Sequence, residues 1–230
     1  MLQTGSKMRL DTTMTAREDI AAMRRQYGEH GLIESELPVN PLELFDTWLK
    51  DAASNEIVVE ANAMVLSTVN EGGPKSRTVL LKDLTPDGFT FFSNYDSNKG
   101  KQIEENNNVS LVFPWYPLER QVIVVGTASK ISRDESEKYF VTRPRGSQIG
   151  AWASAQSTEL LSRGELEKSF AEFEAKWPEG TQIPIPPHWG GYVISPTSIE
   201  FWQGRYSRLH DRIRYVREKN NNWQIKRLNP

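Results

Sequence analysis

Cysteine is absent from the 230 residues of this chain. Its absence excludes disulfides, zinc–thiolate sites, thiol nucleophiles and cysteine-held iron–sulfur clusters, and it is typical of a reducing compartment. The chain also lacks any run of 18 apolar residues, and its first residues, M-L-Q-T-G-S-K-M-R-L-D, contain no apolar signal core. We therefore expect a soluble, cytoplasmic protein that does not enter a membrane.

Several motifs of catalysis and binding are missing as well. The three histidines, His30, His188 and His210, are widely spaced and do not predict a metal site. No G-x-G-x-x-G, G-x-x-x-x-G-K-[ST] or G-x-S-x-G motif is present, which disfavours a Rossmann site, a P-loop and a hydrolase elbow. With 28 basic and 30 acidic residues the net charge is −2, so no overall field favours nucleic acid. For an enzyme, these absences favour chemistry carried by an organic cofactor.

The middle of the chain is rich in Val, Ile, Leu, Phe and Thr with turn residues between the apolar segments. These segments predict strands over residues 64–69, 77–82, 89–93, 109–113 and 121–131. Further strands are predicted over residues 191–195 and 198–203, and over a closing hairpin of residues 213–218 and 223–228. Short connections imply antiparallel pairing. The fold class expected is α+β, with an antiparallel barrel and peripheral helices.

Helix starts are marked by capping residues. Capping boxes at Thr15, Ser132 and Ser162 and the pair Asn40-Pro41 predict four helices, of which the first runs through Arg24 and Tyr27. A short helix is also expected over residues 99–106. Residues 1–14 are polar and unpatterned and are predicted to form a mobile tail, whereas residues 15–230 are predicted to form a single domain.

The most unusual stretch covers residues 199–217, I-E-F-W-Q-G-R-Y-S-R-L-H-D-R-I-R-Y-V-R. Its second part holds five arginines and one histidine against a single acid, Asp211, although the whole chain is slightly acidic. Guanidinium groups suit phosphate and carboxylate oxygens, and Trp202 offers a flat face to an aromatic ring. The stretch indicates a site for a planar anion; a solvated basic strand edge is the alternative.

Four other stretches combine cations with hydroxyls or amides. Arg77 and Lys82 are five apart on a predicted strand, which places them on opposite faces. The loop of residues 93–100 leads into a helix, where free backbone N–H groups favour phosphate. The remaining stretches contain Tyr139, Arg143 and Ser147, and Gln156 with Ser157. Each stretch alone is also compatible with ordinary surface charge. Two phosphate-sized sites would explain all of them together.

The sequence resembles the pyridoxamine/pyridoxine 5′-phosphate oxidase family. The likeness rests on the segments R-T-V-L-L-K, F-F-S-N-Y-D-S-N-K-G, F-P-W-Y-P-L-E-R-Q-V, Y-F-V-T-R-P-R-G-S-Q-I-G-A-W-A-S-x-Q-S and E-F-W-Q-G-x-x-x-R-L-H-D-R, in order from about residue 20 to residue 230. It implies an FMN-binding split β-barrel that works as a homodimer, with FMN at the subunit interface. It also implies oxidation of pyridoxamine or pyridoxine 5′-phosphate to pyridoxal 5′-phosphate, with O2 as acceptor and H2O2 as product.

The resemblance assigns roles to individual residues. FMN contacts are expected at Arg77, Phe92, Ser93, Lys99 and Gln121, and, from the partner subunit, at Gln156, Ser157, Trp202 and Arg212. Substrate phosphate contacts are expected at Lys82, Tyr139, Arg143 and Ser147. Arg208 and His210 are expected to flank the substrate ring as catalytic residues, and Arg24 and Tyr27 to cover it. No metal is expected.

One position departs from the family pattern. The phosphate loop usually reads S-R-K-G, and here Asn98 replaces the arginine among the cofactor-binding positions. A fully made hydrogen bond from that guanidinium would contribute roughly 1.5–3 kcal/mol, so FMN affinity is expected to be weaker. Asn98 also favours a non-catalytic module that binds FMN or pyridoxal phosphate. Another split-barrel flavoenzyme with a different substrate, and a nucleic-acid binder, are the remaining alternatives.

Overall fold

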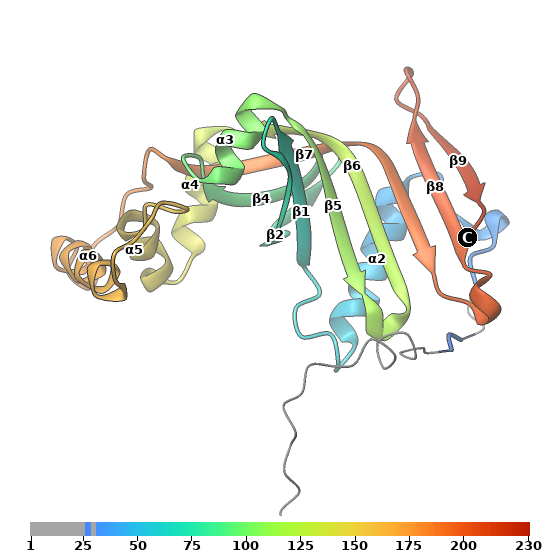
Figure 1. Cartoon of the computed structure of the whole chain (residues 1–230), viewed down its shortest axis with the longest axis horizontal. Helices are drawn as coiled ribbons and strands as arrows, with labels where there is room; N and C mark the ends of the chain where they lie inside the picture. The colour runs from blue at the N-terminus through green and yellow to red at the C-terminus, as the bar shows by residue number, and fades with distance from the viewer. Residues whose placement is uncertain (1–25, 29–30) are drawn as a thin grey trace, which may run out of the picture.

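Nine strands form one antiparallel sheet in a computed structural model that describes residues 26–28 and 31–230 (Figure 1). The strand order is β2-β1-β5-β6-β7-β4-β3, and β8 pairs with β7 and β9. The sheet curls into a split barrel and is not closed. The bounds are β1 Ala63–Asn70, β2 Gly73–Leu80, β3 Asp83–Thr85, β4 Gly88–Asn94, β5 Asn108–Trp115, β6 Arg120–Lys130, β7 Trp189–Gln203, β8 Asp211–Arg217 and β9 Trp223–Leu228.

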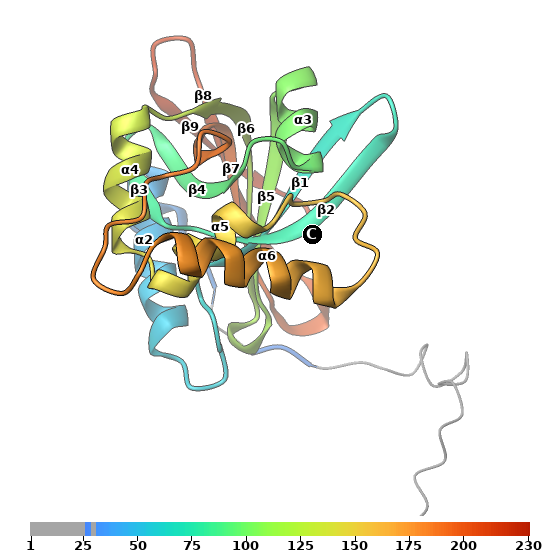
Figure 2. The same cartoon turned by 90° about the vertical axis from the view of Figure 1, so that its left-hand side faces the viewer.

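The longer helices lie at one end of the sheet and against its curled strands. Figure 1 shows α3 to α6 at one end and the β8–β9 hairpin at the other, with α2 packed against the curled strands. Figure 2 shows α5 and α6 lying one over the other at the first of these ends. Within the described residues the helices are η1 Glu34–Glu36, α2 Pro41–Ser54, α3 Asn98–Glu105, η2 Tyr116–Leu118, α4 Arg133–Thr142, α5 Arg145–Ala153, α6 Arg163–Lys176 and η3 Tyr206–Arg208.

The main core lies between α2 and the concave side of the sheet. Asn40 caps α2 by accepting a hydrogen bond from the backbone N–H of Leu42, and Pro41 occupies the first turn. The helix then buries Phe45, Trp48 and Ala52 against the alternating inward residues of the strands. A second, smaller core under α4, α5 and α6 includes Phe140, Ile149 and Trp189. This second core supports the end of the sheet where α3 and α4 lie.

Most predicted strands and helices are confirmed. The predicted second helix is α2, the short helix is α3, and Ser132 forms a complete capping box at the start of α4. The closing hairpin is β8–β9. The first predicted helix, from residue 15, lies almost entirely outside the described residues, and Tyr27 itself is not helical.

Three expectations about elements were wrong. The two strands predicted on either side of Pro196 are one strand, β7, because a bulge in β7 itself leaves Thr197 unpaired between the pairs Gly126↔Pro196 and Val125↔Ser198, and the ladder continues on both sides. Helix α5 was not predicted, since Pro144 ends α4 but also serves as the residue before the first turn of α5. Ser162 precedes α6 without a side-chain capping bond.

Candidate active site

A cavity of about 300 Å³ opens between the end of β2, β4 and the helices α3 and α4. Three of its lining side chains are cations, Lys82, Lys99 and Arg143, and none of the lining residues is acidic. The full lining is Thr78, Val79, Leu80, Lys82, Phe92, Ser93, Lys99, Tyr139, Arg143, Gln156 and Trp189. Seven of the predicted site residues therefore meet at one place. A cavity with this lining attracts an anion.

Arg143 is the cation that most needs a partner. Its Nη1 atom is buried and has no hydrogen-bond partner, while its guanidinium lies over the Trp189 ring at 4.7 Å from the ring centroid. Burial lowers the pKa of Arg143, an effect that the neighbouring Tyr139 partly offsets. A buried unpaired N–H is costly unless a ligand accepts its hydrogen bond. The geometry therefore suits an anionic oxygen at Nη1.

Lys99 is held at the other side of the cavity by neutral groups. Its Nζ donates to Oε1 of Gln156 at 2.7 Å, and the Ser93 hydroxyl donates to the same oxygen at 3.2 Å. Burial and then the charge of Arg77 lower the pKa of Lys99 to about 8. A buried lysine whose pKa is lowered further by a neighbouring arginine indicates a place that an anion would stabilise.

Flat side chains form one wall of the same cavity. The rings of Phe92 and Tyr139 are stacked at a centroid distance of 3.9 Å, and Phe92 is stacked on Trp189 at 5.4 Å. Trp189 was not among the predicted site residues, because it follows the Pro-rich segment before β7 without any motif. The wall combines an aromatic surface with the adjacent cations, as a phosphorylated planar ligand requires.

Ser147 lines an adjoining cavity of about 230 Å³ that shares Arg143, Gln156 and Trp189 with the first. It lies in the first turn of α5, and its backbone N–H donates to the carbonyl of Pro144 at 2.8 Å. Arg143 stands between the two cavities. The helix break at Pro144 therefore does not separate Ser147 from Arg143, since the turn that follows brings both to the same region.

A second group of predicted residues lies across β6, β7 and β8. Gln121, Trp202 and Arg212 are directly opposite one another in the registers of the three strands, so their side chains share one face. The Trp202 and His210 rings are 4.7 Å apart, and Tyr27 packs edge-on against both. These contacts join five predicted residues into one group at the β8–β9 end of the sheet.

Arg212 is fixed by a buried carboxylate. Glu200 accepts hydrogen bonds from Nε of Arg212 at 2.8 Å and from Nη2 of Arg214 at 2.7 Å. Burial alone would raise the pKa of Glu200, but the hydrogen bonds from the two arginines outweigh it and lower that pKa. The other predicted arginine here, Arg208, is exposed and lies in η3.

Backbone strain marks both groups. Ser207 and Arg208 have φ values of 55° and 62°, and Ser157 has a φ of 76°, all in the left-handed region that non-glycine residues rarely adopt. Such conformations persist only where the surrounding structure holds them, and they are common at ligand sites. The strain thus coincides with three positions at or next to the predicted ligand contacts.

One expectation about the site residues was wrong, and two others stay predictions. Arg77 lies in β2, but β2 ends at Leu80, so Lys82 follows the strand rather than sharing it. Gln156 bonds to Lys99 and Ser93 of its own chain, and its contact with FMN from the partner subunit stays a prediction. Gln121 is the register partner of Trp202, and its FMN contact also stays a prediction.

The other predicted positions are placed as follows. Asn98 begins α3 immediately before Lys99, Ser157 follows Gln156 in the chain, and Arg24 lies outside the described residues.

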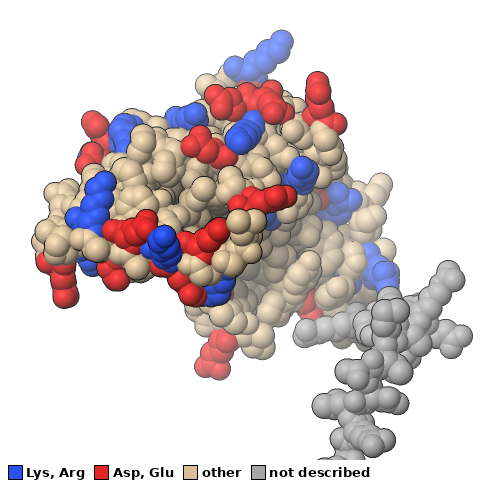
Figure 3. Space-filling view, turned by 60° about the vertical axis from the view of Figure 1, so that its left-hand side comes forward, with Lys and Arg blue, Asp and Glu red and all other residues tan. Residues whose placement is uncertain are grey.

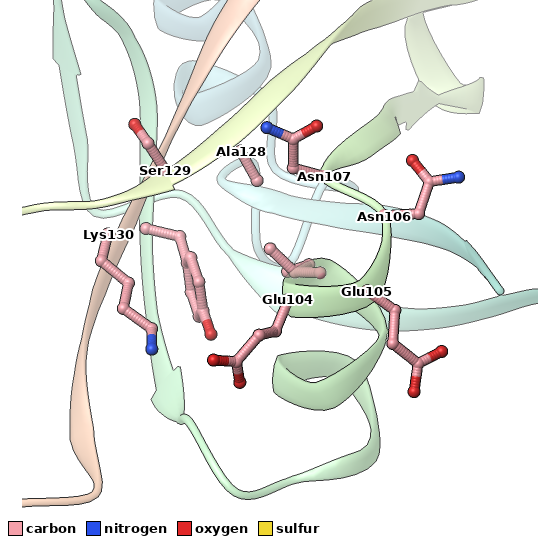
Figure 4. A pocket seen from close by; sticks show the side chains of 9 residues that line it. Glu104, Glu105, Asn106, Asn107, Ala128, Ser129 and Lys130 are labelled. Atoms are coloured by element: carbon pink, nitrogen blue, oxygen red, sulfur yellow. The ribbon is translucent and has the colours of Figure 1, made fainter.

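Other surface features are less suited to an anion. A depression of about 380 Å³ at the end of α3, shown in Figure 4, presents the carboxylates of Glu104 and Glu105 with the amides of Asn106 and Asn107 and one cation, Lys130. On the face shown in Figure 3, acidic and basic side chains are interspersed, without the basic patch that nucleic acid requires. In the part of the chain that the structure describes, no helix is long and apolar enough to span a membrane, and no group of three side chains would hold a metal.

The fold defines a split-barrel protein, and its cavity combines cations with an aromatic wall. Residues 51–177 match the family described as pyridoxamine 5′-phosphate oxidase, and residues 189–230 match the pyridoxine 5′-phosphate oxidase C-terminal dimerisation region. The chain belongs to the pyridoxamine 5′-phosphate oxidase family.

Curated relatives agree with this assignment. The chain is 50% identical over 224 residues to the pyridoxine/pyridoxamine 5′-phosphate oxidase of Streptomyces avermitilis. The matched residues cover 94% of this chain and 100% of that protein. It is 53% identical over 213 residues to that of Rippkaea orientalis, covering 92% and 100%.

Solved structures confirm the fold. The structure of PhzG from Burkholderia lata, in complex with tetrahydrophenazine-1-carboxylic acid, has a TM-score of 0.81 and 29% identity, covering 88% of this chain and 99% of that one. An FMN-binding, pyridoxamine 5′-phosphate oxidase-related protein from Nostoc punctiforme has a TM-score of 0.67 and 17% identity, covering 84% and 100%.

Proposed function

We propose that this chain is an FMN-dependent oxidase that converts pyridoxamine 5′-phosphate or pyridoxine 5′-phosphate to pyridoxal 5′-phosphate. The observation that carries the proposal is the buried, unpaired Nη1 of Arg143 in a cavity whose charged lining is wholly cationic. Cofactor and substrate are both planar rings that carry a phosphate ester. Each needs cations at one end and a flat surface at the other, which the aromatic wall beside Arg143 supplies.

Arg77 and Lys99 would hold the FMN phosphate, with hydrogen bonds from Ser93, Gln156 and Ser157. The lowered pKa of Lys99, caused by burial and by Arg77, supports this role, because a dianion would relieve the repulsion between the two cations. Bound FMN supplies a two-electron acceptor for hydride, which the side chains of this site do not offer. The protein contributes position and charge.

The substrate phosphate would be held by Arg143, Lys82, Tyr139 and Ser147, which lie around the two adjoining cavities. Binding energy from this remote phosphate can hold the reacting carbon in a productive position. Arg208 and His210 would flank the substrate ring and stabilise charge on it. Tyr27, edge-on to His210, would cover the ring, together with Arg24.

We further propose that the active sites lie at the interface of a homodimer. The two groups of site residues lie at different ends of the sheet. Phe92 of the first group pairs with Gly191 on β7, and Gly191 is eleven residues along that strand from Trp202 of the second group. An extended strand of that length spans up to about 36 Å. Gln121, Trp202 and Arg212 would therefore serve the FMN bound by the partner subunit. The match to a dimerisation region over residues 189–230 supports this arrangement.

The overall reaction would use O2 as the electron acceptor. It would take place in the cytoplasm, a reducing compartment that the lack of cysteine favours. Pyridoxine phosphate and O2 would give pyridoxal phosphate and H2O2. The amine substrate would additionally take up one water and release ammonia.

The test is a visible spectrum of the purified protein, followed by anaerobic addition of pyridoxamine 5′-phosphate and then air. We expect flavin absorbance that bleaches with substrate and returns with O2 as H2O2 appears. A flavin that never bleaches would identify a carrier. Bleaching only by unphosphorylated substrates would identify a different split-barrel flavoenzyme. A protein that binds no added FMN would overturn the proposal.

A further inference from the structure

Arg77 does not extend freely from its strand. Its Nη1 donates to the hydroxyl of Thr68 at 2.7 Å and to the carbonyl of Leu66 at 3.3 Å, and its Nη2 donates to Oε1 of Gln102 at 3.0 Å. The Thr68 hydroxyl in turn donates to the same Gln102 oxygen at 2.7 Å. Guanidinium, hydroxyl and amide thus form a closed set of hydrogen bonds between β1, β2 and α3.

Thr68 and Gln102 are both buried, with exposed fractions of 2% and 3%. Polar side chains at this depth are present only where they are hydrogen-bonded, and an apolar pair of the same size would pack without that requirement. Gln102 also lies one turn after Lys99 on α3, on the same face of the helix. The helix therefore presents one residue to the cavity and another to the guanidinium beside it.

The three oxygens that accept hydrogen bonds from Arg77 carry no charge. Arg212, in the second group of site residues, bonds instead to the carboxylate of Glu200. A carboxylate would orient the guanidinium equally well but would cancel its charge. Neutral acceptors orient Arg77 and leave its positive charge available to a ligand, as the repulsion felt by Lys99 indicates.

We propose that Gln102, with Thr68, is a positioning residue that fixes the Arg77 guanidinium for the FMN phosphate while preserving its charge. The inference rests on the proposed function in one respect, namely that Arg77 and Lys99 bind that phosphate. Gln102 itself is behind Arg77 and acts through it.

The test is FMN affinity, measured by flavin fluorescence quenching on the apoprotein of the full chain. Gln102→Glu keeps the shape but supplies a carboxylate, and we expect FMN affinity to fall at least tenfold with an unchanged or higher melting temperature. Asn107→Asp, an exposed change of the same charge just after α3, is the matched control and should change affinity less than twofold. Equal affinity of Gln102→Glu and the unaltered protein would overturn the inference.

Two further variants keep the result interpretable if Gln102→Glu folds poorly. Gln102→Met should weaken FMN binding in the unaltered background but have little added effect when combined with Arg77→Lys, because both act on one guanidinium. At saturating FMN its kcat should match that of the unaltered protein. Additive losses would overturn the positioning role. If Arg77→Lys alone leaves FMN affinity unchanged, the failure lies with the proposed phosphate site rather than with Gln102.

Discussion

The imidazole Nδ1 of His210 accepts a hydrogen bond from the backbone N–H of Arg205 at 3.1 Å. An accepting nitrogen carries no proton, so the ring is the neutral tautomer with its proton on Nε2. Burial, and then the charge of Arg208, lower the pKa of His210 below its usual value of 6.5. At neutral pH the His210 ring is therefore neutral and has a donor at Nε2.

This tautomer predicts the acidic side of the pH profile. As pH falls through the lowered pKa, a proton added at Nδ1 would break the bond from Arg205 and place a second charge beside Arg208. We expect kcat/KM to be flat near pH 7 and to fall about tenfold per unit below the His210 pKa. His210→Gln, which cannot titrate, should lose this limb. An apparent pKa above 6.5, or an unchanged limb in the variant, would contradict the assignment.

The lowered pKa of Lys99 predicts that FMN affinity also depends on pH. Burial and Arg77 lower its pKa to about 8 in the protein without ligand, and a bound phosphate would raise it again. Above pH 8 the free protein must take up a proton to bind FMN. We therefore expect the Kd to increase by up to about tenfold per pH unit above 8. Fluorescence titration of the apoprotein at several pH values measures this.

Two variants serve as controls for the Lys99 experiment. Lys99→Met should weaken FMN binding at pH 7 and remove the dependence above pH 8. Lys101→Met, an exposed lysine on the same helix, should bind FMN as the unaltered protein does at every pH. If the dependence persists in Lys99→Met, another group titrates in this range.

Replacing Arg143 is expected to weaken substrate binding rather than cofactor binding. Arg143→Met removes the unpaired Nη1 donor and its charge, and we expect KM for pyridoxamine 5′-phosphate to rise by about 100-fold, as loss of a buried charge-assisted hydrogen bond implies. FMN affinity should change little. Arg163→Met, at an exposed ion pair on α6, is the control. A loss of kcat at unchanged KM would place Arg143 in a different role.

Local chemistry made much of the fold predictable. Strand alternation and the residues between strands identified most of the sheet, and the caps at Asn40 and Ser132 marked the starts of α2 and α4. The element boundaries were less accurate where two rules competed. Two strands were predicted on either side of Pro196, but a bulge at the adjacent Thr197 keeps them in one strand, β7. The continuous pairing depends on the neighbouring strand, where Gly126 lies opposite Pro196 and has no side chain to meet the Ser195 carbonyl, and spacing along the chain does not reveal this.

The site was predictable in its members but not in its grouping. Motifs identified Lys99, Arg143 and Gln156, and the structure brings them together. Which residues share a cavity depends on register and on the curl of the sheet, which spacing does not reveal, so the neighbours of Gln121 and Gln156 within the chain could not be predicted. Trp189 and the supporting Gln102 carry no motif at all, and only packing reveals them.

The separation of the two groups predicts that mixed dimers can recover activity. If each active site takes Arg143 from one subunit and Arg212 from the other, Arg143→Ala and Arg212→Ala homodimers should each have two damaged sites. A heterodimer of the two variants has one site with both changes and one with neither. Equal mixing by unfolding and refolding should therefore recover about a quarter of the unaltered activity, since half of the dimers are mixed and each has one intact site.

The control for this experiment is a pair of variants within one group. Arg143→Ala mixed with Lys82→Ala, both from the cavity of the first group, should recover nothing, because both residues serve the same site from the same chain and every mixed site carries one change. Size-exclusion chromatography verifies that dimers have formed again. If the Arg143 and Arg212 variants also recover nothing although mixed dimers are present, both residues act within one chain. The two groups, which are separated along β7, would then have to come together in the active molecule by a rearrangement of the sheet. Continuous pairing from β4 through β7 to β8 strongly resists such a rearrangement.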